Sequence, residues 1–398
     1  MAAPAERILA APPEGARLLT GAEAVAHAMR QIEPDVVPVY PITPQTPIIQ
    51  TFARFAADGL TATEIINVES EHSAMSAAVG SALAGARTMT ATASQGLALM
   101  IEVVYIAASM RAPIVMAVGN RALSGPINIH CDHSDSMLAR DSGAVQLFVE
   151  NAQEAYDFTL MATRIAEHPD VRLPVLVCQD GFTITHSAEP VSLLDDHAVK
   201  DFVGAYSIPH SLLDVARPTT QGPFAMPDSY FELKRQQEDA MTASLAALGR
   251  TAADFAARSG RAYDAVEAYR LDDAERAIVL LGSSAGTAKD VVDDLRRRGA
   301  RVGLVEIRMF RPFPVDAVRR ALSHVADVAV LDRSLSFGGH PPLYADVAAA
   351  LYGSAASLRS YVYGLGGRDL GPELIERVYD ELGTGVPGPA IRYLGLRA

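Results

Sequence analysis

The sequence has 398 residues, of which 49% are hydrophobic and 20% charged, as in a soluble globular protein with a large buried core. This length exceeds a single core, so we expect two domains. The net charge of −13 argues against nucleic acid or an anionic membrane surface as the main partner. No signal peptide is recognisable, and the most apolar stretch, residues 97–118, contains Glu102 and Arg111, so it falls short of the ~20 apolar residues of a membrane span. We therefore expect a cytoplasmic protein.

Reactive residue types are scarce. Two cysteines, Cys131 and Cys178, cannot hold an iron–sulfur cluster or a structural zinc ion by themselves. The only lysines are Lys200, Lys234 and Lys289, which leaves few candidates for Schiff-base chemistry. No G-x-x-x-x-G-K-[ST] phosphate loop occurs. We expect no metal to be held by this chain alone.

The first half of the chain alternates strand-like and helix-like segments. Residues 21–32 have helical spacing of apolar residues, with Thr20 as the expected N-cap. Pro41, Pro44 and Pro47 end the first buried strand and stiffen the turn that follows. The alternation predicts a six-stranded Rossmann-like domain. The expected strands are 36–39, 64–68, 88–93, 113–118, one near 146 and 174–179, and the expected helices include 48–55, 73–86 and 97–110.

The second half begins with a looser, proline-rich stretch and ends in a second α/β unit. Residues 187–255 surround a charged helix expected at 231–248, and we interpret them as a long connection. Strands expected at 277–281 and 302–307 then flank a helix at 288–298, which predicts a smaller parallel sheet of four or five strands. The predicted organisation is an N-terminal arm (1–18), a first domain (19–200), a connecting segment (201–260) and a second domain (261–398).

Polar residues follow three of the expected strands of the first domain. In open α/β sheets, ligands bind at the carboxyl ends of the strands. The acids near these ends, Glu64, Glu69 and Glu71, cannot be ranked by composition. Thr43 lies on the proline-stiffened loop as an uncharged donor, and Arg121 offers a fork suited to a carboxylate. Together they suit a small 2-oxoacid beside a cofactor; the alternative is that they are helix caps and a surface salt bridge.

Three further motifs are weaker. The run from His130 to His133 contains two histidines and a cysteine, but its H-x-x-H spacing fits neither a helical pair nor paired C-x-x-C, so a metal site is disfavoured. Residues 282–287 resemble a loose phosphate loop without G-x-G-x-x-G. The glycine-rich turn 364–369 is more typical of backbone geometry or a docking contact than of catalysis.

Taken together, motifs along nearly the whole chain resemble the α chain of pyruvate:ferredoxin oxidoreductase. A string of motifs in this order is more specific than any one of them. The motifs are Tyr40-Pro41-Ile42-Thr43-Pro44, Glu69-Ser70-Glu71, 92–97, Asn120-Arg121-Ala122, 130–135, Leu173-Pro174-Val175, Asp180-Gly181-Phe182, 282–287, 310–314, 331–334 and 364–369.

The resemblance implies a thiamine-diphosphate enzyme that converts pyruvate, coenzyme A and oxidised ferredoxin to acetyl-CoA, CO2 and reduced ferredoxin. The first domain would be the pyrimidine-binding domain, and the second is similar to the transketolase C-terminal domain. Glu71 matches the family's cofactor glutamate, which hydrogen-bonds the aminopyrimidine ring nitrogen. Thr43 and Arg121 match substrate-binding residues, with Arg121 pairing the substrate carboxylate.

Two expected elements of such an enzyme are missing from this chain. The diphosphate half of these sites uses a G-D-G motif followed by an Asn to hold magnesium, and neither this motif nor a four-cysteine cluster site is present. The resemblance therefore implies a complex. A β subunit would supply the diphosphate site, Mg2+ and a 4Fe-4S cluster, while γ and δ subunits or their fusion would add coenzyme A contacts and further clusters.

Two alternatives stay open. The same mechanism could act on 2-oxoglutarate, a branched-chain or aryl 2-oxoacid, or oxalate, because side-chain specificity depends on pocket residues that the sequence does not place. The chain could instead be a non-catalytic scaffolding subunit, in which case replacing Glu71 would leave the activity of the complex intact.

Overall fold

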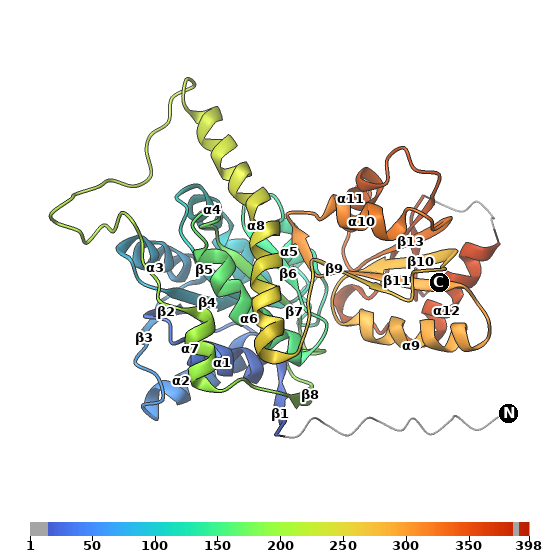
Figure 1. Ribbon diagram of the computed structural model, residues 1–398, viewed down its shortest axis with the longest axis horizontal. Helices are drawn as coiled ribbons and strands as arrows, with labels where there is room; N and C mark the ends of the chain where they lie inside the picture. Colours follow the sequence, from blue (N-terminus) through green and yellow to red (C-terminus); the bar gives the residue numbers. More distant parts are fainter. Residues whose placement is uncertain (1–14, 385–389, 398) are drawn as a thin grey trace.

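The computed structural model describes residues 15–384 and 390–397 and forms two α/β domains that lie side by side (Figure 1). The first domain is built on a seven-stranded sheet of order β12-β6-β7-β5-β4-β2-β3. Its six strands from the first half of the chain are parallel, as predicted. Their bounds are β2 (Val36–Val39), β3 (Glu64–Asn67), β4 (Thr88–Thr92), β5 (Ile114–Asn120), β6 (Val145–Phe148) and β7 (Val175–Asp180).

Helices cover both faces of this sheet, so its central strands are apolar on both sides. In β5, Val115 and Ala117 face one core, whereas Ile114, Met116 and Val118 face the other. This explains why these strands read as continuous apolar runs. One face carries α1 (Gly21–Ile32), α2 (Thr46–Ala57), α6 (Ala152–Glu167), α7 (Asp196–Val203) and α8 (Tyr230–Ser259), and the other carries α3 (Glu71–Ala84), α4 (Ser94–Ser109) and α5 (Ser134–Leu138).

The capping residues fix where these helices begin. Thr20 forms a capping box with Glu23, which confirms the predicted start of α1. The helix expected from residue 73 begins two residues earlier, at Glu71, because the Ser70 hydroxyl accepts the backbone N–H of Ser73. Glu71 therefore occupies the first turn of a helix rather than a loop.

The second domain contains a six-stranded sheet of order β15-β14-β13-β10-β11-β9. Five strands are parallel, in line with the prediction, but β9 is added antiparallel at the edge. The strands are β9 (Val266–Tyr269), β10 (Arg276–Leu280), β11 (Val302–Ile307), β13 (Asp327–Asp332), β14 (Ser357–Val362) and β15 (Arg392–Tyr393), with helices α9 (Ser284–Arg297), α10 (Val315–Leu322), α11 (Pro342–Ala350) and α12 (Pro372–Gly383).

The two domains are joined through shared structure. Strand β12 (Met309–Arg311) follows β11 in the chain but pairs with β6, so the second half of the chain completes the first sheet. Beside it, the rings of Phe148 and Phe310 meet edge to face at 6.0 Å. Lys289 Nζ lies 2.6 Å from Glu150 and 3.1 Å from Glu306, and therefore links α9 to the first domain.

Several segments differ from the sequence-based expectation. The expected arm, 1–18, falls mainly outside the described residues, and its last two residues begin β1 (Arg17–Thr20), which pairs with β8 (Ala188–Val191). The charged helix α8 runs well past residue 248, because Ala247, Leu248 and Phe255 are buried against the first domain. The 282–287 turn is the start of α9 rather than a loop that encloses a phosphate. No helix in the described part of the chain is both long and apolar enough to cross a bilayer.

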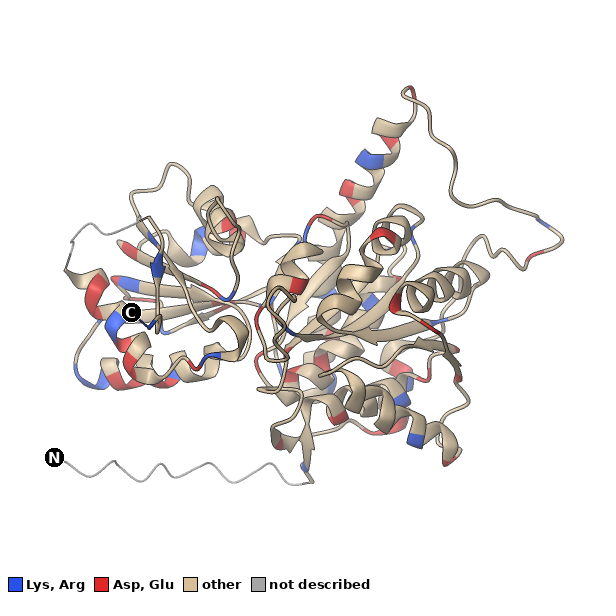
Figure 2. Ribbon diagram, turned by 180° about the vertical axis from the view of Figure 1, so that it is seen from behind, with Lys and Arg blue, Asp and Glu red and all other residues tan. Residues whose placement is uncertain are grey.

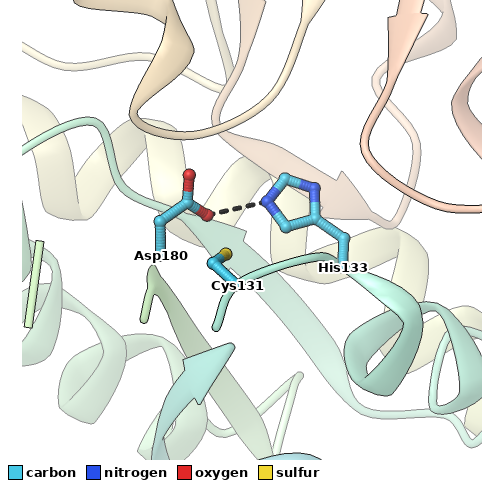
Figure 3. Close-up of side chains that lie close together, drawn as sticks. All are labelled: Cys131, His133 and Asp180. Carbon is cyan, nitrogen blue, oxygen red and sulfur yellow. Dashed lines mark hydrogen bonds and ion pairs between the residues drawn. The ribbon is translucent and has the colours of Figure 1, made fainter. Parts of the chain in front are cut away.

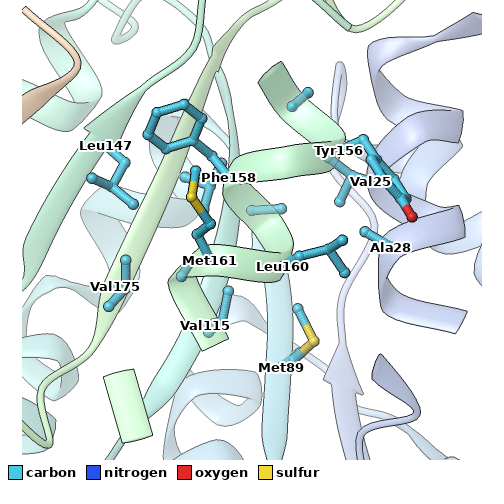
Figure 4. Packing of buried hydrophobic residues seen from close by; sticks show 14 of the residues in the cluster. Val25, Ala28, Met89, Val115, Leu147, Tyr156, Phe158, Leu160, Met161 and Val175 are labelled. Atoms are coloured by element: carbon cyan, nitrogen blue, oxygen red, sulfur yellow. The ribbon is translucent and has the colours of Figure 1, made fainter. Parts of the chain in front are cut away.

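The core beneath the sheet should control stability. Phe158 on α6 is fully buried beside Met161 and Leu147 (Figure 4). Phe158→Ala should lower the free energy of unfolding by about 3–5 kcal/mol, because it removes a large side chain and leaves a cavity. The exposed Phe337 provides the control, since Phe337→Ala should change stability by less than about 0.5 kcal/mol. Equal urea midpoints for the two variants, followed by circular dichroism, would contradict this packing.

Candidate functional site

The polar residues predicted to form a site all follow strands that end at one edge of the first sheet. Thr43 follows β2, Glu71 follows β3, Gly96 follows β4 and Arg121 follows β5. Because these strands are parallel neighbours in the order β5-β4-β2-β3, their carboxyl ends lie next to one another. The fold thus brings the predicted residues to a common edge.

Burial separates the three acids that the sequence could not rank. Glu64 and Glu69 are exposed, whereas Glu71 is only 7% exposed. The Glu69 carboxylate accepts a hydrogen bond from the Ser73 hydroxyl, which lowers the pKa of Glu69. The structure therefore singles out Glu71 as the buried acid of this edge.

The Glu71 carboxylate lies in a space that a glycine creates. A Cβ atom at Gly96 would come within 2.9 Å of Glu71 Oε1 and 2.4 Å of Thr92 Oγ1, so only glycine fits there. Among the described residues, Glu71 has no hydrogen-bond donor and the buried Thr92 hydroxyl has no partner. A buried acid without a partner is costly unless a ligand supplies a donor. The first turn of α3 also favours a negative charge at this position.

Thr43 and Arg121 are in direct contact. Arg121 Nη1 donates to the Thr43 carbonyl at 2.7 Å, and its Nε donates to the Asn128 carbonyl at 3.2 Å. No carboxylate among the described residues pairs with this guanidinium, which excludes the alternative of a surface salt bridge within that part of the chain. Nη2 is therefore free to bind an anionic group, and the Thr43 side chain is exposed beside it.

Asp135 joins the two groups of residues. Its Oδ2 accepts the backbone N–H of Ser94 at 2.9 Å and that of Arg121 at 3.0 Å, while Oδ1 accepts from Asn120 Nδ2 at 2.8 Å. Ser94 adopts a left-handed backbone conformation (φ 46°) at the start of α4, the helix that also carries Gly96. The carboxylate of Asp135 thus fixes α4, which borders Glu71, relative to the strand that presents Arg121.

Complete burial raises the pKa of Asp135 to about 6, even though three donors from Asn120, Arg121 and Ser94 act to lower it. Sequence analysis included Asp135 in a motif but gave it no role. Its aspartate-serine surroundings gave no sign of this role, because the partners are 14 and 41 positions away in the chain.

The second domain holds the loop that follows Arg121. Asn128 Nδ2 donates to the Gly366 carbonyl at 3.0 Å, and the Gly367 N–H donates to the Cys131 carbonyl at 2.7 Å. The glycine-rich turn 364–369 is therefore a docking contact, one of the two roles expected for it. Since the Asn128 carbonyl also accepts from Arg121, this contact reaches the predicted substrate-binding residue.

The histidine-cysteine motif forms part of a buried clamp between the domains. Cys131, His133 and Asp180 lie close together (Figure 3), and His133 Nε2 is 2.7 Å from Asp180 Oδ1. Asp180 Oδ2 accepts from Arg333 at 2.7 Å and from the Ser283 hydroxyl at 2.5 Å. Burial alone would raise the pKa of Asp180, but His133 and Arg333 hold it well below its usual range. The carboxylate already has cationic partners, so this arrangement suits a clamp better than a metal centre.

The geometry fits one half of a coenzyme site. Glu71 offers an acceptor for a ring N–H, and the unpartnered Thr92 hydroxyl lies next to it, so the edge suits a polar heterocycle. The described residues include no G-D-G motif that would hold a diphosphate and its magnesium ion. These observations support the pyrimidine half of thiamine diphosphate and leave its charged tail to another polypeptide.

Comparisons with known proteins agree with this geometry. Residues 27–248 match the family described as pyruvate flavodoxin/ferredoxin oxidoreductase, thiamine diphosphate-binding. Residues 274–375 match pyruvate:ferredoxin oxidoreductase core domain II. Both matches follow the two α/β units of the fold.

Relatives cover nearly the whole chain. The pyruvate synthase subunit PorA of Thermotoga maritima is 58% identical over 95% of this chain and 97% of its own length. The α subunit of the NADH-dependent phenylglyoxylate dehydrogenase of Aromatoleum evansii is 40% identical over 92% of this chain and 90% of its own. A solved structure, the 2-oxoglutarate:ferredoxin oxidoreductase of Magnetococcus marinus, superimposes with a TM-score of 0.72 at 20% identity, over 93% of this chain and 65% of that chain. At this identity the structural likeness shows the fold alone.

Asp135 makes a testable contribution to the pH dependence of stability. Its pKa of about 6 in the folded protein exceeds the ordinary value of 3.8, so the folded state keeps a proton that the unfolded chain releases between these values. The stability that Asp135 contributes is therefore fully present below pH 4 and is lost as pH rises through 6. Asp135→Asn should remove this trend, so that wild type gains about 3 kcal/mol over the variant between pH 7 and pH 4. Urea unfolding at a series of pH values measures it, and parallel curves would contradict the assignment.

Proposed function

The chain belongs to the pyruvate flavodoxin/ferredoxin oxidoreductase family, and on that premise we propose that it is the α subunit of a thiamine-diphosphate-dependent 2-oxoacid:ferredoxin oxidoreductase. The reaction is the conversion of pyruvate, coenzyme A and oxidised ferredoxin to acetyl-CoA, CO2 and reduced ferredoxin. The observation that carries this proposal is the buried, unpartnered carboxylate of Glu71 at the carboxyl edge of a parallel sheet.

Glu71 has the role of holding the pyrimidine ring of the coenzyme. Its carboxylate would bind a proton on the ring nitrogen and keep the ring in the tautomer that can accept a proton elsewhere. When bound, thiamine diphosphate supplies the nucleophilic carbon that attacks the keto group of a 2-oxoacid. The contact with Gly96 sets the depth of the Glu71 side chain, so the ring lies against the start of α4.

Arg121 and Thr43 bind the substrate in this proposal. The free Nη2 of Arg121 pairs with the carboxylate of the 2-oxoacid, and the exposed Thr43 hydroxyl donates to one of its oxygens. Pro44 stiffens the loop that carries Thr43, and its ring lies beside Gly119 and Gly181 at the ends of two strands. The acid is thereby oriented before reaction, which is a major source of catalytic rate.

The rest of the enzyme comes from other subunits. The relatives carry subunit names, which supports a complex of several chains. We propose that a β subunit holds the diphosphate, Mg2+ and a 4Fe-4S cluster, and that γ and δ subunits or their fusion take part with coenzyme A and ferredoxin.

The identity of the 2-oxoacid has one specific alternative. The phenylglyoxylate dehydrogenase α subunit is 40% identical to this chain, so an aryl 2-oxoacid is the second candidate substrate. Pyruvate is favoured by the higher identity, 58%, to a pyruvate synthase subunit. A panel of 2-oxoacids with coenzyme A and a viologen dye, applied to the native complex, distinguishes them by relative kcat/KM. Activity on no 2-oxoacid would overturn the proposed function.

Glu71→Gln tests the coenzyme role directly. The amide cannot hold the ring proton as a carboxylate does, so turnover of the complex should fall at least about 100-fold. Glu69→Gln is the matched control, since Glu69 lies two residues away but is exposed, and its turnover should stay within about twofold of wild type. A Glu71→Gln complex with wild-type turnover would instead favour the scaffolding alternative.

Arg121→Lys tests substrate binding. Lysine keeps the positive charge but loses the planar fork, so KM for the 2-oxoacid should rise about 10- to 100-fold while the coenzyme content of the complex stays the same. Steady-state kinetics and a thiamine assay measure the two effects. An unchanged KM would remove Arg121 from the substrate site.

A further inference from the structure

A long segment projects from the first domain with apolar side chains on its surface. We call residues 204–239 the arm: it includes the 204–229 loop and the first turns of α8, and Figure 1 shows it extending beyond α3 and α4. Six of its large apolar side chains are more than half exposed, and none of residues 230–239 is buried. These side chains are Leu213, Val215, Phe224, Met226, Tyr230 and Phe231.

The base of the arm is fixed to the body. The Leu212 N–H donates to the Leu83 carbonyl at 3.0 Å, and the Ser211 hydroxyl donates to the Ala84 carbonyl, both at the end of α3. Gly222 lies against Met110, just past α4. The arm is therefore held in a defined direction by the ends of α3 and α4, and its apolar tip is presented rather than folded back.

A helix tip in this state lacks the packing that normally stabilises it. Most helical stability in proteins comes from burial of an apolar face, and contiguous exposed apolar patches mark interaction sites. The 204–229 loop carries only three charged residues, of which Asp214 and Arg217 pair with each other at 2.7 Å, and Figure 2 shows how sparsely the arm is charged. The chemistry of the arm therefore fits an apolar protein surface and not a polyanion.

The arm continues into the outer face of α4. A cleft of about 340 Å3 lies between them, lined by Tyr105 of α4 and by Lys234 and Gln237 of the arm. Along α4, Leu99 and Ile106 are also exposed. This face begins at the end of α4 that carries Gly96, beside Glu71, and its 16 residues span about 24 Å. One exposed apolar surface thus runs from the proposed coenzyme edge to the arm.

We propose that the arm and the outer face of α4 form the docking surface for the subunit that holds the diphosphate half of the coenzyme. This inference rests on the proposed function, because Glu71 at one end of the surface needs a partner chain for the coenzyme tail. That chain must reach the start of α4, and the same face leads it to the arm at the other end. The aromatic side chains Phe224 and Phe231 then act as apolar anchors.

Paired substitutions test the docking surface. Phe224→Ser with Phe231→Ser should weaken binding of this chain to the diphosphate-binding subunit at least about 100-fold, because two anchors are lost. Phe337→Ser with Tyr352→Ser is the matched control, since both residues are exposed on the second domain, and its affinity should equal that of wild type. Native mass spectrometry of the purified complex over a dilution series gives the dissociation constants. The melting temperature of the full chain should not differ among the three proteins.

The outcomes are separable. Wild-type affinity in the arm variant, or loss only of a contact between two copies of this chain, would overturn the docking proposal. In the wild-type complex, backbone amides of 224–233 should exchange hydrogen at least about tenfold more slowly than in the isolated chain, and equal exchange would also overturn it. The proposed function fails by a different measurement, a wild-type complex that contains no thiamine diphosphate, whatever the arm variant does.

Discussion

The buried carboxylate of Asp135 is the interaction on which the candidate site depends. It accepts the backbone N–H groups of Ser94 and Arg121 and so ties together the ends of two neighbouring strands. Through α4 it also sets the position of Gly96 against Glu71. Burial of this charge costs stability, as its raised pKa shows, and the donors offset only part of the cost. The protein thus retains an unfavourable group where a precise backbone arrangement is needed.

The second domain supports the same edge from the other side. Its glycine-rich turn binds Asn128, whose carbonyl accepts from Arg121, and its Arg333 and Ser283 hold Asp180 at the end of β7. Strand β12 also completes the first sheet. A chain cut between the domains would therefore lose contacts that position the loop after Arg121. This gives the second domain a structural part in substrate binding without any residue of its own at the proposed substrate position.

The edge carries one half of the chemistry that the proposed reaction needs. Glu71 and Arg121 supply an acceptor and a cation, whereas the described residues offer no site for a diphosphate with its metal ion. An incomplete site at the surface of one chain has a physical consequence, because the missing half must be delivered across an interface. The exposed apolar surface along α4 and the arm is consistent with that requirement.

The sequence by itself determined the architecture, since periodic apolar runs separated by turn residues predict two parallel-sheet domains, and local chemistry such as the Thr20 cap is confirmed. It also placed Thr43, Glu71 and Arg121 after successive strands, because parallel strands end at a common edge. Only the tertiary structure distinguished buried Glu71 from exposed Glu64 and Glu69, assigned Asp135 its partners and moved β12 into the first sheet. Burial and hydrogen bonding between residues distant in sequence depend on how the elements pack, and no local pattern encodes that.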